Sequence, residues 1–303
     1  DYAKAYNNMG AAFRDQVKLE ASLEAYKKVI LLDPNYAEAY NNMGDIFRDQ
    51  EKFDEAIEAY KKALLLKPNY AQAYNNIGIT FKVQGKINEA IDTFKKVTEL
   101  NPNYADGFNN LGATLSDHGK LKEAVEAYNK AISLRPNDAT TYFNMGNALQ
   151  EQGNTNEAVK AYKKAILLKP DYAKAYNNMG AAFRDQVKLE ESLEAYKKAL
   201  SIKYDFPEAH HNMSYTLLNS GRVKEGLDAY EWRFETEVFK SHERNFSRPF
   251  LNKKQRLYNK TILIWSEQGI GDTIRWSSCL SSLAAQAKHC ILECQEKLVP
   301  LLK

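Results

Sequence analysis

The sequence predicts an all-α solenoid of stacked helix hairpins, followed by a truncated α/β segment. Two observations predict the solenoid. The stretch Ala-Tyr-Asn-Asn-Met-Gly at residues 39–44 returns, identically or in looser form, every 34 residues, and each copy precedes a second apolar stripe at helical spacing. A fixed period of this length is typical of stacked-repeat proteins. The third observation, an apolar run at residues 261–265 before a glycine-containing turn, predicts the α/β segment.

Residues 37–70 illustrate one repeat. The apolar residues of 37–50 recur at helical spacing, and those of 53–66 do the same. The joint between the two stretches is short, so the helices must be antiparallel. Pro68 prevents the second helix from continuing, and we expect Asn69 to cap the first helix of the next repeat.

A glycine inside each first helix needs an explanation, because Gly costs about 1 kcal/mol relative to Ala in a helix interior. Gly44 has a counterpart in five other repeats. We expect it to let the two helix backbones of a repeat approach closely, opposite small residues such as Ala56.

The period, the hairpin pattern, the helical glycine and the recurring proline resemble the tetratricopeptide (TPR) repeat. The resemblance implies a right-handed superhelix of hairpins, with the first helices lining a concave groove. We assign residues 1–234 to this array of about seven repeats, namely 3–36, 37–70, 71–104, 105–138, 139–172, 173–206 and a degenerate 207–240.

Two segments of the array are almost identical. Residues 1–28 and 171–198 differ only at Ala21 against Glu191, which indicates a recent duplication. Asp1 and its neighbour match the end of an earlier repeat, so we expect further repeats upstream in the parent gene.

Asparagine recurs at two adjacent positions on the polar side of the first helices. Asn is an indifferent helix former, so its repetition needs a reason. The second position of the pair is Asn in all seven repeats: Asn8, Asn42, Asn76, Asn110, Asn144, Asn178 and Asn212. The first position is Asn in five: Asn7, Asn41, Asn75, Asn109 and Asn177.

These asparagines predict a ladder of amides that binds an extended peptide backbone, with about one Asn for every third ligand residue. The alternative is that they bond neighbouring helices within the solenoid, and the two roles can coexist. An Asn ladder in this place resembles the TPR superhelix of the O-linked N-acetylglucosamine transferase, in which such residues hold a substrate backbone. That resemblance implies a protein or peptide ligand in the groove.

Charged side chains alternate along the same predicted groove. The candidate ligand-binding cations are Arg14, Arg48, Lys82 and Arg184. The alternative is a solvated face with local ion pairs. Carboxylates at neighbouring positions disfavour nucleic acid. The first Asn position is never Lys, which argues against the carboxylate clamp of chaperone-binding TPR domains.

The C-terminal part loses the 34-residue period. Residues 235–260 are rich in Lys and Arg and are interpreted as a basic linker. Residues 261–303 have the pattern of a βαβ unit, the start of a Rossmann-like domain. The expected order is a strand at 261–265, a turn at 266–271, a helix from Asp272 to about 287 and a strand at 290–294.

Short words at 226–233, 248–250, 264–274 and 292–295 resemble bacterial proteins that fuse TPR repeats to a heptosyltransferase-like glycosyltransferase. The resemblance implies that Asp272 is a general base, beside an acceptor site at the turn of Gly269 and Gly271. The alternative is that Asp272 only caps a helix. A nucleotide sugar is implied for the parent protein, whereas this chain would end inside the first lobe and lack activity. We expect no cofactor and no metal in this fragment.

Composition narrows the remaining function classes. The net charge of +3 gives no strong field toward nucleic acid or a membrane. No apolar stretch reaches the roughly 20 residues of a membrane span, and three Cys without a Cys-x-x-Cys pair favour a reducing, cytoplasmic setting. The sequence thus favours an interaction scaffold that binds an extended peptide. The alternatives are a parent glycosyltransferase whose repeats recruit a protein acceptor, and a self-associating solenoid.

Overall fold

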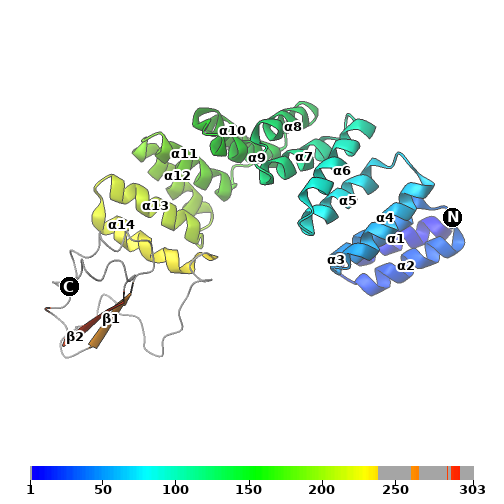
Figure 1. Ribbon diagram of the computed structural model, residues 1–303, viewed down its shortest axis with the longest axis horizontal. Helices are drawn as coiled ribbons and strands as arrows, with labels where there is room; N and C mark the ends of the chain where they lie inside the picture. The colour runs from blue at the N-terminus through cyan, green and yellow to red at the C-terminus, as the bar shows by residue number, and fades with distance from the viewer. Residues whose placement is uncertain (1, 238–260, 266–284, 286–287, 294–303) are drawn as a thin grey trace. The chain divides into compact units, whose positions relative to one another are not determined.

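The computed structural model describes residues 2–237, 261–265, 285 and 288–293. The chain divides into two compact units, Asp1–His242 and Glu243–Lys303, which are described separately. Figure 1 shows the helical elements of the first unit and the two strands of the second.

The described part of the first unit is all-helical and consists of seven antiparallel hairpins (Figure 1). The first helices are α1 (Tyr2–Asp15), α3 (Ala37–Asp49), α5 (Ala71–Val83), α7 (Ala105–Asp117), α9 (Ala139–Glu151), α11 (Ala173–Asp185) and α13 (Pro207–Asn219). The second helices are α2 (Leu19–Leu32), α4 (Phe53–Leu66), α6 (Ile87–Leu100), α8 (Leu121–Leu134), α10 (Thr155–Leu168), α12 (Leu189–Ile202) and α14 (Val223–Tyr230). A 3-10 helix, η1 (Glu231–Glu235), follows.

The hairpins stack in chain order. Each second helix packs against the first helix of the next hairpin, and consecutive first helices also contact one another. In the described part of the array the main helix contacts therefore join neighbours in the row, which is the organisation of a solenoid. The prediction of an all-helical repeat array is confirmed.

An aromatic ring from the second helix occupies the centre of each hairpin. The rings of Tyr26, Tyr60, Phe94, Tyr128, Tyr162 and Tyr196 are almost completely buried. They lie against the helical glycines. A Cβ atom added at Gly44 would come within 2.5 Å of the Tyr60 ring, and the other five helical glycines meet their rings in the same way.

This contact corrects the sequence-based account of the glycines. The expectation was that Gly44 faces a small residue such as Ala56. The structure shows that a large aromatic ring fills the space, and that the missing side chain accommodates it. The ring packs directly on the backbone at the glycine, and this packing offsets the free-energy cost of a glycine in a helix interior.

The turn inside each hairpin requires a left-handed backbone residue. Gly85, Gly119, Gly153 and Gly221 have φ angles of 74° to 80° there. The first, second and sixth repeats have Val17, Glu51 and Val187 at the same place, with φ angles of 57° to 61°. A β-branched residue in this conformation is strained, and the repeat pattern does not predict it.

The expected cap of the first helices is wrong. Helix α5 begins at Ala71 and its N-cap residue is Tyr70, which makes no side-chain cap hydrogen bond. Asn69 therefore lies one residue too early to cap. Among the first helices, α9 differs because its N-cap Asp138 accepts a hydrogen bond from the backbone N–H of Thr140.

The described part of the second unit contains two strands, β1 (Thr261–Trp265) and β2 (His289–Glu293). They pair in parallel, from Thr261 opposite His289 to Trp265 opposite Glu293. Strand β1 has the expected bounds, and β2 begins one residue before the expected position. The expected helix and nearly all of the basic linker lie outside the described residues, so the α/β segment as a whole stays a prediction.

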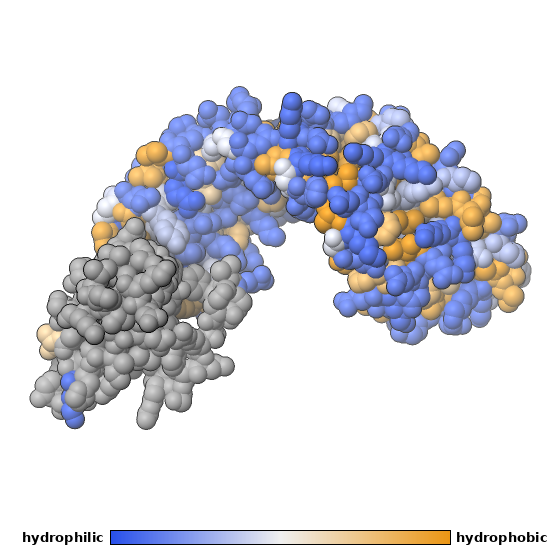
Figure 2. Space-filling view, in the orientation of Figure 1, coloured by the Kyte–Doolittle hydropathy of each residue, from blue (hydrophilic) through white to orange (hydrophobic). Residues whose placement is uncertain are grey.

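The surface of the array is mostly hydrophilic in the face that Figure 2 shows, with apolar patches between polar side chains. Leu31, Leu65 and Leu167, which occupy the same position of three second helices, are highly exposed. No helix in the described residues has the length and apolar character needed to cross a membrane.

Candidate functional site

The first helices present a polar surface that we call the first-helix face. It consists of the side chains at residues 38, 41, 42, 45, 48 and 49 of the second repeat and their equivalents in the other repeats. These residues lie on the side of each first helix that does not contribute to the apolar stripe. All the asparagines and cations predicted as groove residues belong to this face.

The asparagines of consecutive repeats are hydrogen-bonded to one another. The second Asn of one repeat donates from Nδ2 to Oδ1 of the first Asn of the preceding repeat. These bonds are Asn42 to Asn7 (3.1 Å), Asn76 to Asn41 (3.1 Å), Asn110 to Asn75 (2.9 Å), Asn144 to Asn109 (3.5 Å) and Asn212 to Asn177 (3.1 Å).

One junction departs from this rule because Phe143 replaces the first Asn of the fifth repeat. Asn178 donates instead to Oδ1 of Asn147, which lies one turn further along α9, at 2.8 Å. The Phe143 ring contacts Tyr172 with a centroid distance of 4.9 Å. The hydrogen bond between side-chain amides of these two repeats is thus kept, with a different acceptor.

The bonds explain why two asparagines recur side by side. Adjacent hairpins are offset so that a residue in one first helix faces the residue 35 positions later, one more than the repeat length. A donor at the second position therefore meets an acceptor at the first position of the previous repeat wherever that position is Asn. The alternative stated from the sequence, that the asparagines bond neighbouring helices, is present in the structure.

Burial differs between the two sets of asparagines. Asn41, Asn75 and Asn177 of the first set are buried, whereas most residues of the second set are partly exposed. An Asn side chain offers two donors and two acceptor lone pairs. The bond between repeats uses one donor of the second Asn. Oδ1 of Asn42 and Oδ1 of Asn178 also accept from the Asn before them, at 3.5 and 3.0 Å. The partly exposed Asn110, Asn144 and Asn212 keep one amide hydrogen and their oxygen available for a ligand.

The junction between the first and second repeats also contains a partly buried ionic network. Arg14 contacts Oδ2 of Asp45 at 3.0 Å and Oδ2 of Asp49 at 2.9 Å, both in the next repeat. Arg48 lies 3.4 Å from Oδ1 of Asp45 and donates to the Tyr60 hydroxyl at 3.2 Å. The Tyr60 hydroxyl in turn donates to Asp45 at 2.7 Å. Burial and then the Asp45 charge raise the pKa of Tyr60 far above its ordinary value.

Other members of the face repeat the same offset. Lys82 contacts Asp117, 35 residues later, at 2.8 Å. Gln150 donates to Oδ2 of Asp185 at 3.1 Å with the same separation. Arg14, Arg48 and Lys82 therefore each have a carboxylate partner within 3.4 Å, as the interpretation of a face with local ion pairs expected. Arg184 differs, since its described ion pair is with Asp185 at 3.7 Å.

Asp45, Asn147 and Tyr60 are members of the face or its network that sequence analysis did not select. Asp45 is mostly buried and Asn147 is partly buried. The signal that could have found them is the offset of the stacking. A search for complementary residues 31 or 35 positions apart identifies the pairs Arg14 with Asp45 and Asn178 with Asn147.

The seventh repeat keeps the second Asn, Asn212, and has an aromatic ring in place of the first. His211 occupies the first Asn position and contacts Tyr215 and Tyr230, with ring centroids 5.0 and 5.5 Å away. Burial, and then the charges of Arg233 and Arg184, lower the pKa of His211. Both the burial and the two charges favour the neutral form of the ring.

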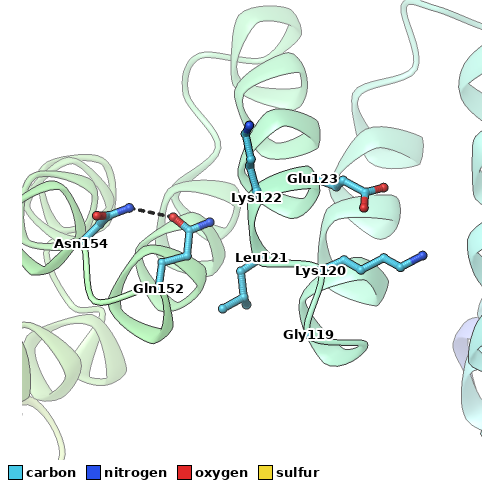
Figure 3. A pocket seen from close by; sticks show the side chains of 7 residues that line it. All are labelled: Gly119, Lys120, Leu121, Lys122, Glu123, Gln152 and Asn154. Atoms are coloured by element: carbon cyan, nitrogen blue, oxygen red, sulfur yellow. Dashed lines mark hydrogen bonds between the residues drawn. The ribbon is translucent and has the colours of Figure 1, made fainter.

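A shallow depression of about 610 Å³ lies at the turns of the fourth and fifth hairpins (Figure 3). Gln152 accepts a hydrogen bond of 2.8 Å from Asn154 beside it. The charged groups of Lys120, Lys122 and Glu123 point away from Gln152 (Figure 3). The residues that line this depression are not members of the first-helix face, and their polar groups do not converge on a common point.

Asp272, Gly269 and Gly271, predicted for an acceptor site, lie outside the described residues. Within the residues that the structure describes, no three His, Cys, Asp or Glu side chains gather as ligands for a metal ion.

Models of one repeat family match most of the array. A model described as TPR repeat matches residues 10–47, 44–85, 115–153, 146–187 and 180–221. Models described as tetratricopeptide repeat match residues 71–104 and 93–126. A search of curated protein sequences gave no significant match.

Solved structures with a similar fold include YrrB, described as a TPR protein with an unusual peptide-binding site. It is 28% identical, the match covers 62% of this chain and 97% of YrrB, and the TM-score is 0.53. A MamA structure is 31% identical over 55% of this chain and 92% of MamA, with a TM-score of 0.51. Pseudomonas aeruginosa pilF shares the fold at 19% identity, with a TM-score of 0.62, over 71% of this chain and 97% of pilF.

Proposed function

The chain belongs to the tetratricopeptide repeat family, and on this premise we propose that its array is a scaffold that binds an extended segment of a partner protein along the first-helix face. TPR arrays are typical scaffolds of protein–protein interaction. The observation that carries the proposal is the row of asparagine amides that are fixed by bonds between repeats and, at Asn42, Asn110, Asn144 and Asn212, still partly exposed.

The chemistry of these amides suits a polypeptide backbone. A backbone offers one N–H donor and one carbonyl acceptor per residue, and an exposed Asn can bond both. Because the inter-repeat bonds already hold the side chains, little rotamer freedom would be lost on binding. YrrB, described with a peptide-binding site, supports this class of ligand.

The experiment is selection from a displayed library of random peptides by the immobilised full chain. Peptides of roughly 12 residues would extend across about four repeats. We expect Asn110→Ala together with Asn144→Ala to weaken binding of the selected peptides. Asn129→Ala, an exposed Asn on the second helix α8, is the matched control and should bind like the parent chain.

A modified peptide separates backbone recognition from side-chain recognition. N-methylation of the backbone removes donors and keeps every side chain, so it should strongly weaken binding. Unchanged affinity of the methylated peptide, or equal affinity of the Asn110→Ala, Asn144→Ala variant, would reject the amide ladder as the binding element.

A second function is favoured by the parallel pairing of β1 and β2. Parallel neighbours need a crossover connection, usually helical, and residues 266–288 connect these strands. We propose that they begin a glycosyltransferase-like domain of the parent protein, with Asp272 as the acceptor's general base. Turnover of nucleotide sugars by the full-length gene product tests this, and undiminished activity of its Asp272→Asn variant would contradict the assigned base.

A further inference from the structure

The duplicated segments place the same arginine in two different surroundings. Residues 1–28 and 171–198 are identical except at one position, and Arg14 corresponds to Arg184. Arg14 is bonded to Asp45 and Asp49 of the following repeat. The local sequence of the two arginines is therefore the same, and any difference between them comes from the next repeat.

The repeat that follows Arg184 supplies no carboxylate at these positions. Tyr215 stands in the place of Asp45, and Asn219 in the place of Asp49. Among the described residues, Arg184 has an ion pair only with Asp185, at 3.7 Å, and Asp185 already accepts a hydrogen bond from Gln150 at 3.1 Å. The Arg184 side chain is 27% exposed.

A buried hydroxyl that no carboxylate contacts lies near this arginine. Tyr196 is completely buried, and its hydroxyl, which lies near the hydroxyls of Ser192 and Thr216, makes no hydrogen bond of standard geometry within the described residues. The equivalent hydroxyl of Tyr60 donates to Asp45 in the second repeat. Ala181 occupies the position of that aspartate in the sixth repeat. In the second repeat, the carboxylate of Asp45 binds both the arginine and the tyrosine at these positions. Their counterparts in the sixth repeat, Arg184 and Tyr196, have no such carboxylate between them.

The start of α11 shows a second missing carboxylate. Glu38 contacts Lys67 at 3.4 Å, and Asp106 contacts Arg135 at 2.7 Å, in the second and fourth repeats. The equivalent residues of the sixth repeat are both lysines, Lys174 and Lys203. Lys174 at the start of this helix therefore faces a second lysine where the second and fourth repeats have an ion pair.

We propose that the polypeptide bound on the first-helix face is acidic where it crosses the sixth repeat, with one carboxylate paired to Arg184. This inference rests on the proposed function and specifies its partner. Arg184 would bind an aspartate or glutamate side chain of the ligand, in the role that Asp45 has for Arg14 and Arg48. A guanidinium and a carboxylate form charge-assisted hydrogen bonds of matched geometry.

The charge pattern favours an acidic polypeptide over nucleic acid. Lys174 and Arg184 are about 15 Å apart along α11, which an extended chain covers in about five residues. Asp117, Glu151 and Asp185 lie on the neighbouring positions of the face and would repel a continuous polyanion. A segment with spaced carboxylates avoids that repulsion.

The experiment measures binding of three labelled peptide pools to the full chain by fluorescence anisotropy. The pools share their length and are rich in Asp and Glu, in Asn and Gln, or in Lys and Arg. We expect the acidic pool to bind most tightly. Arg184→Ala should weaken its binding about tenfold and leave the neutral pool unchanged. Lys198→Ala, which removes an exposed cation of the second helix α12 outside the first-helix face, is the matched control.

A second variant keeps Arg184 and supplies the missing partner. Asn219→Asp places a carboxylate 35 residues after Arg184, the separation of Asp49 from Arg14. Asn219 is exposed, so the fold should tolerate the change. The variant should lower binding of the acidic pool as Arg184→Ala does, without loss of helical structure by circular dichroism. Unchanged acidic binding in both variants would overturn the proposal.

The outcomes separate this inference from the proposed function. If the acidic and neutral pools bind equally, and only the Asn110→Ala, Asn144→Ala variant weakens them, the amide ladder stands and the acidic preference is rejected. If no pool binds, the proposed function fails and this inference fails with it. A single-stranded oligonucleotide that bound through Arg184 more tightly than the acidic pool would overturn the polypeptide as the partner.

Discussion

The hydroxyl of Tyr60 donates a 2.7 Å hydrogen bond to the mostly buried carboxylate of Asp45. The equivalent hydroxyl in the sixth repeat, that of Tyr196, has no carboxylate to donate to and makes no hydrogen bond of standard geometry among the described residues. We therefore expect Tyr60→Phe to lower the free energy of unfolding by about 1–3 kcal/mol, because a buried acceptor loses a donor. Tyr196→Phe should cause little loss or a slight gain, and Phe94 shows that the position accepts Phe. Urea unfolding of both variants measures the difference, and equal losses would contradict it.

The hydrogen bond from Asn76 to Asn41 predicts a structural cost for removing an Asn of the ladder. Asn76→Ala leaves the buried oxygen of Asn41 without its donor and should destabilise the array by about 1–3 kcal/mol. Asn8 is exposed, so Asn8→Ala is the control and should change stability by less than about 0.5 kcal/mol. A comparable loss in the control would show that the amide bonds do not join the repeats.

Strain at the hairpin turns predicts a stabilising substitution. Val187 has a φ angle of 61° and is 77% exposed, so it gains little packing in return for its conformation. Val187→Gly should raise the free energy of unfolding by about 1 kcal/mol. The reverse change at the equivalent turn, Gly153→Val, should lower it by a similar amount. Thermal unfolding followed by circular dichroism measures both, and a lower midpoint for Val187→Gly would contradict the assignment of strain.

His210 predicts a pH dependence of the seventh repeat. Its ring stacks on Trp232 at 4.0 Å, and Nε2 donates to the carbonyl oxygen of Tyr204 at 3.0 Å. Burial lowers the pKa of His210, against weaker opposing effects of Tyr204 and Asp205. At a pH between the lower pKa of the folded state and the higher pKa of the unfolded state, His210 binds more protons in the unfolded chain. Stability should consequently fall as the pH drops below about 6.5.

Unfolding of the full chain between pH 7.5 and roughly pH 5 tests this dependence. In the His210→Phe variant the slope of stability against pH should decrease, and it should decrease again when His211 is also replaced, since burial lowers the pKa of both rings. An identical slope in the parent chain and in the double variant would assign the pH dependence to other groups.

Much of the fold could be predicted from the sequence because the repeat period and the apolar spacing are local properties. The helix hairpins follow from apolar residues that recur three and four positions apart between breaks such as Pro68 and the short turns. The role of Gly44 could not be predicted in the same way. It depends on which side chain of the second helix points at it, and the Tyr60 ring rather than a small residue does so.

The sequence by itself determined that the asparagines recur in pairs and share the polar side of the first helices. Only the tertiary structure decided how they are used, because stacking offsets the hairpins so that residues 35 positions apart meet. The same offset distinguishes Arg14 from Arg184. Their local sequences are the same, and the partner that each one meets is set by the following repeat. Pairing between repeats depends on the packing geometry, which the local pattern of one repeat does not specify.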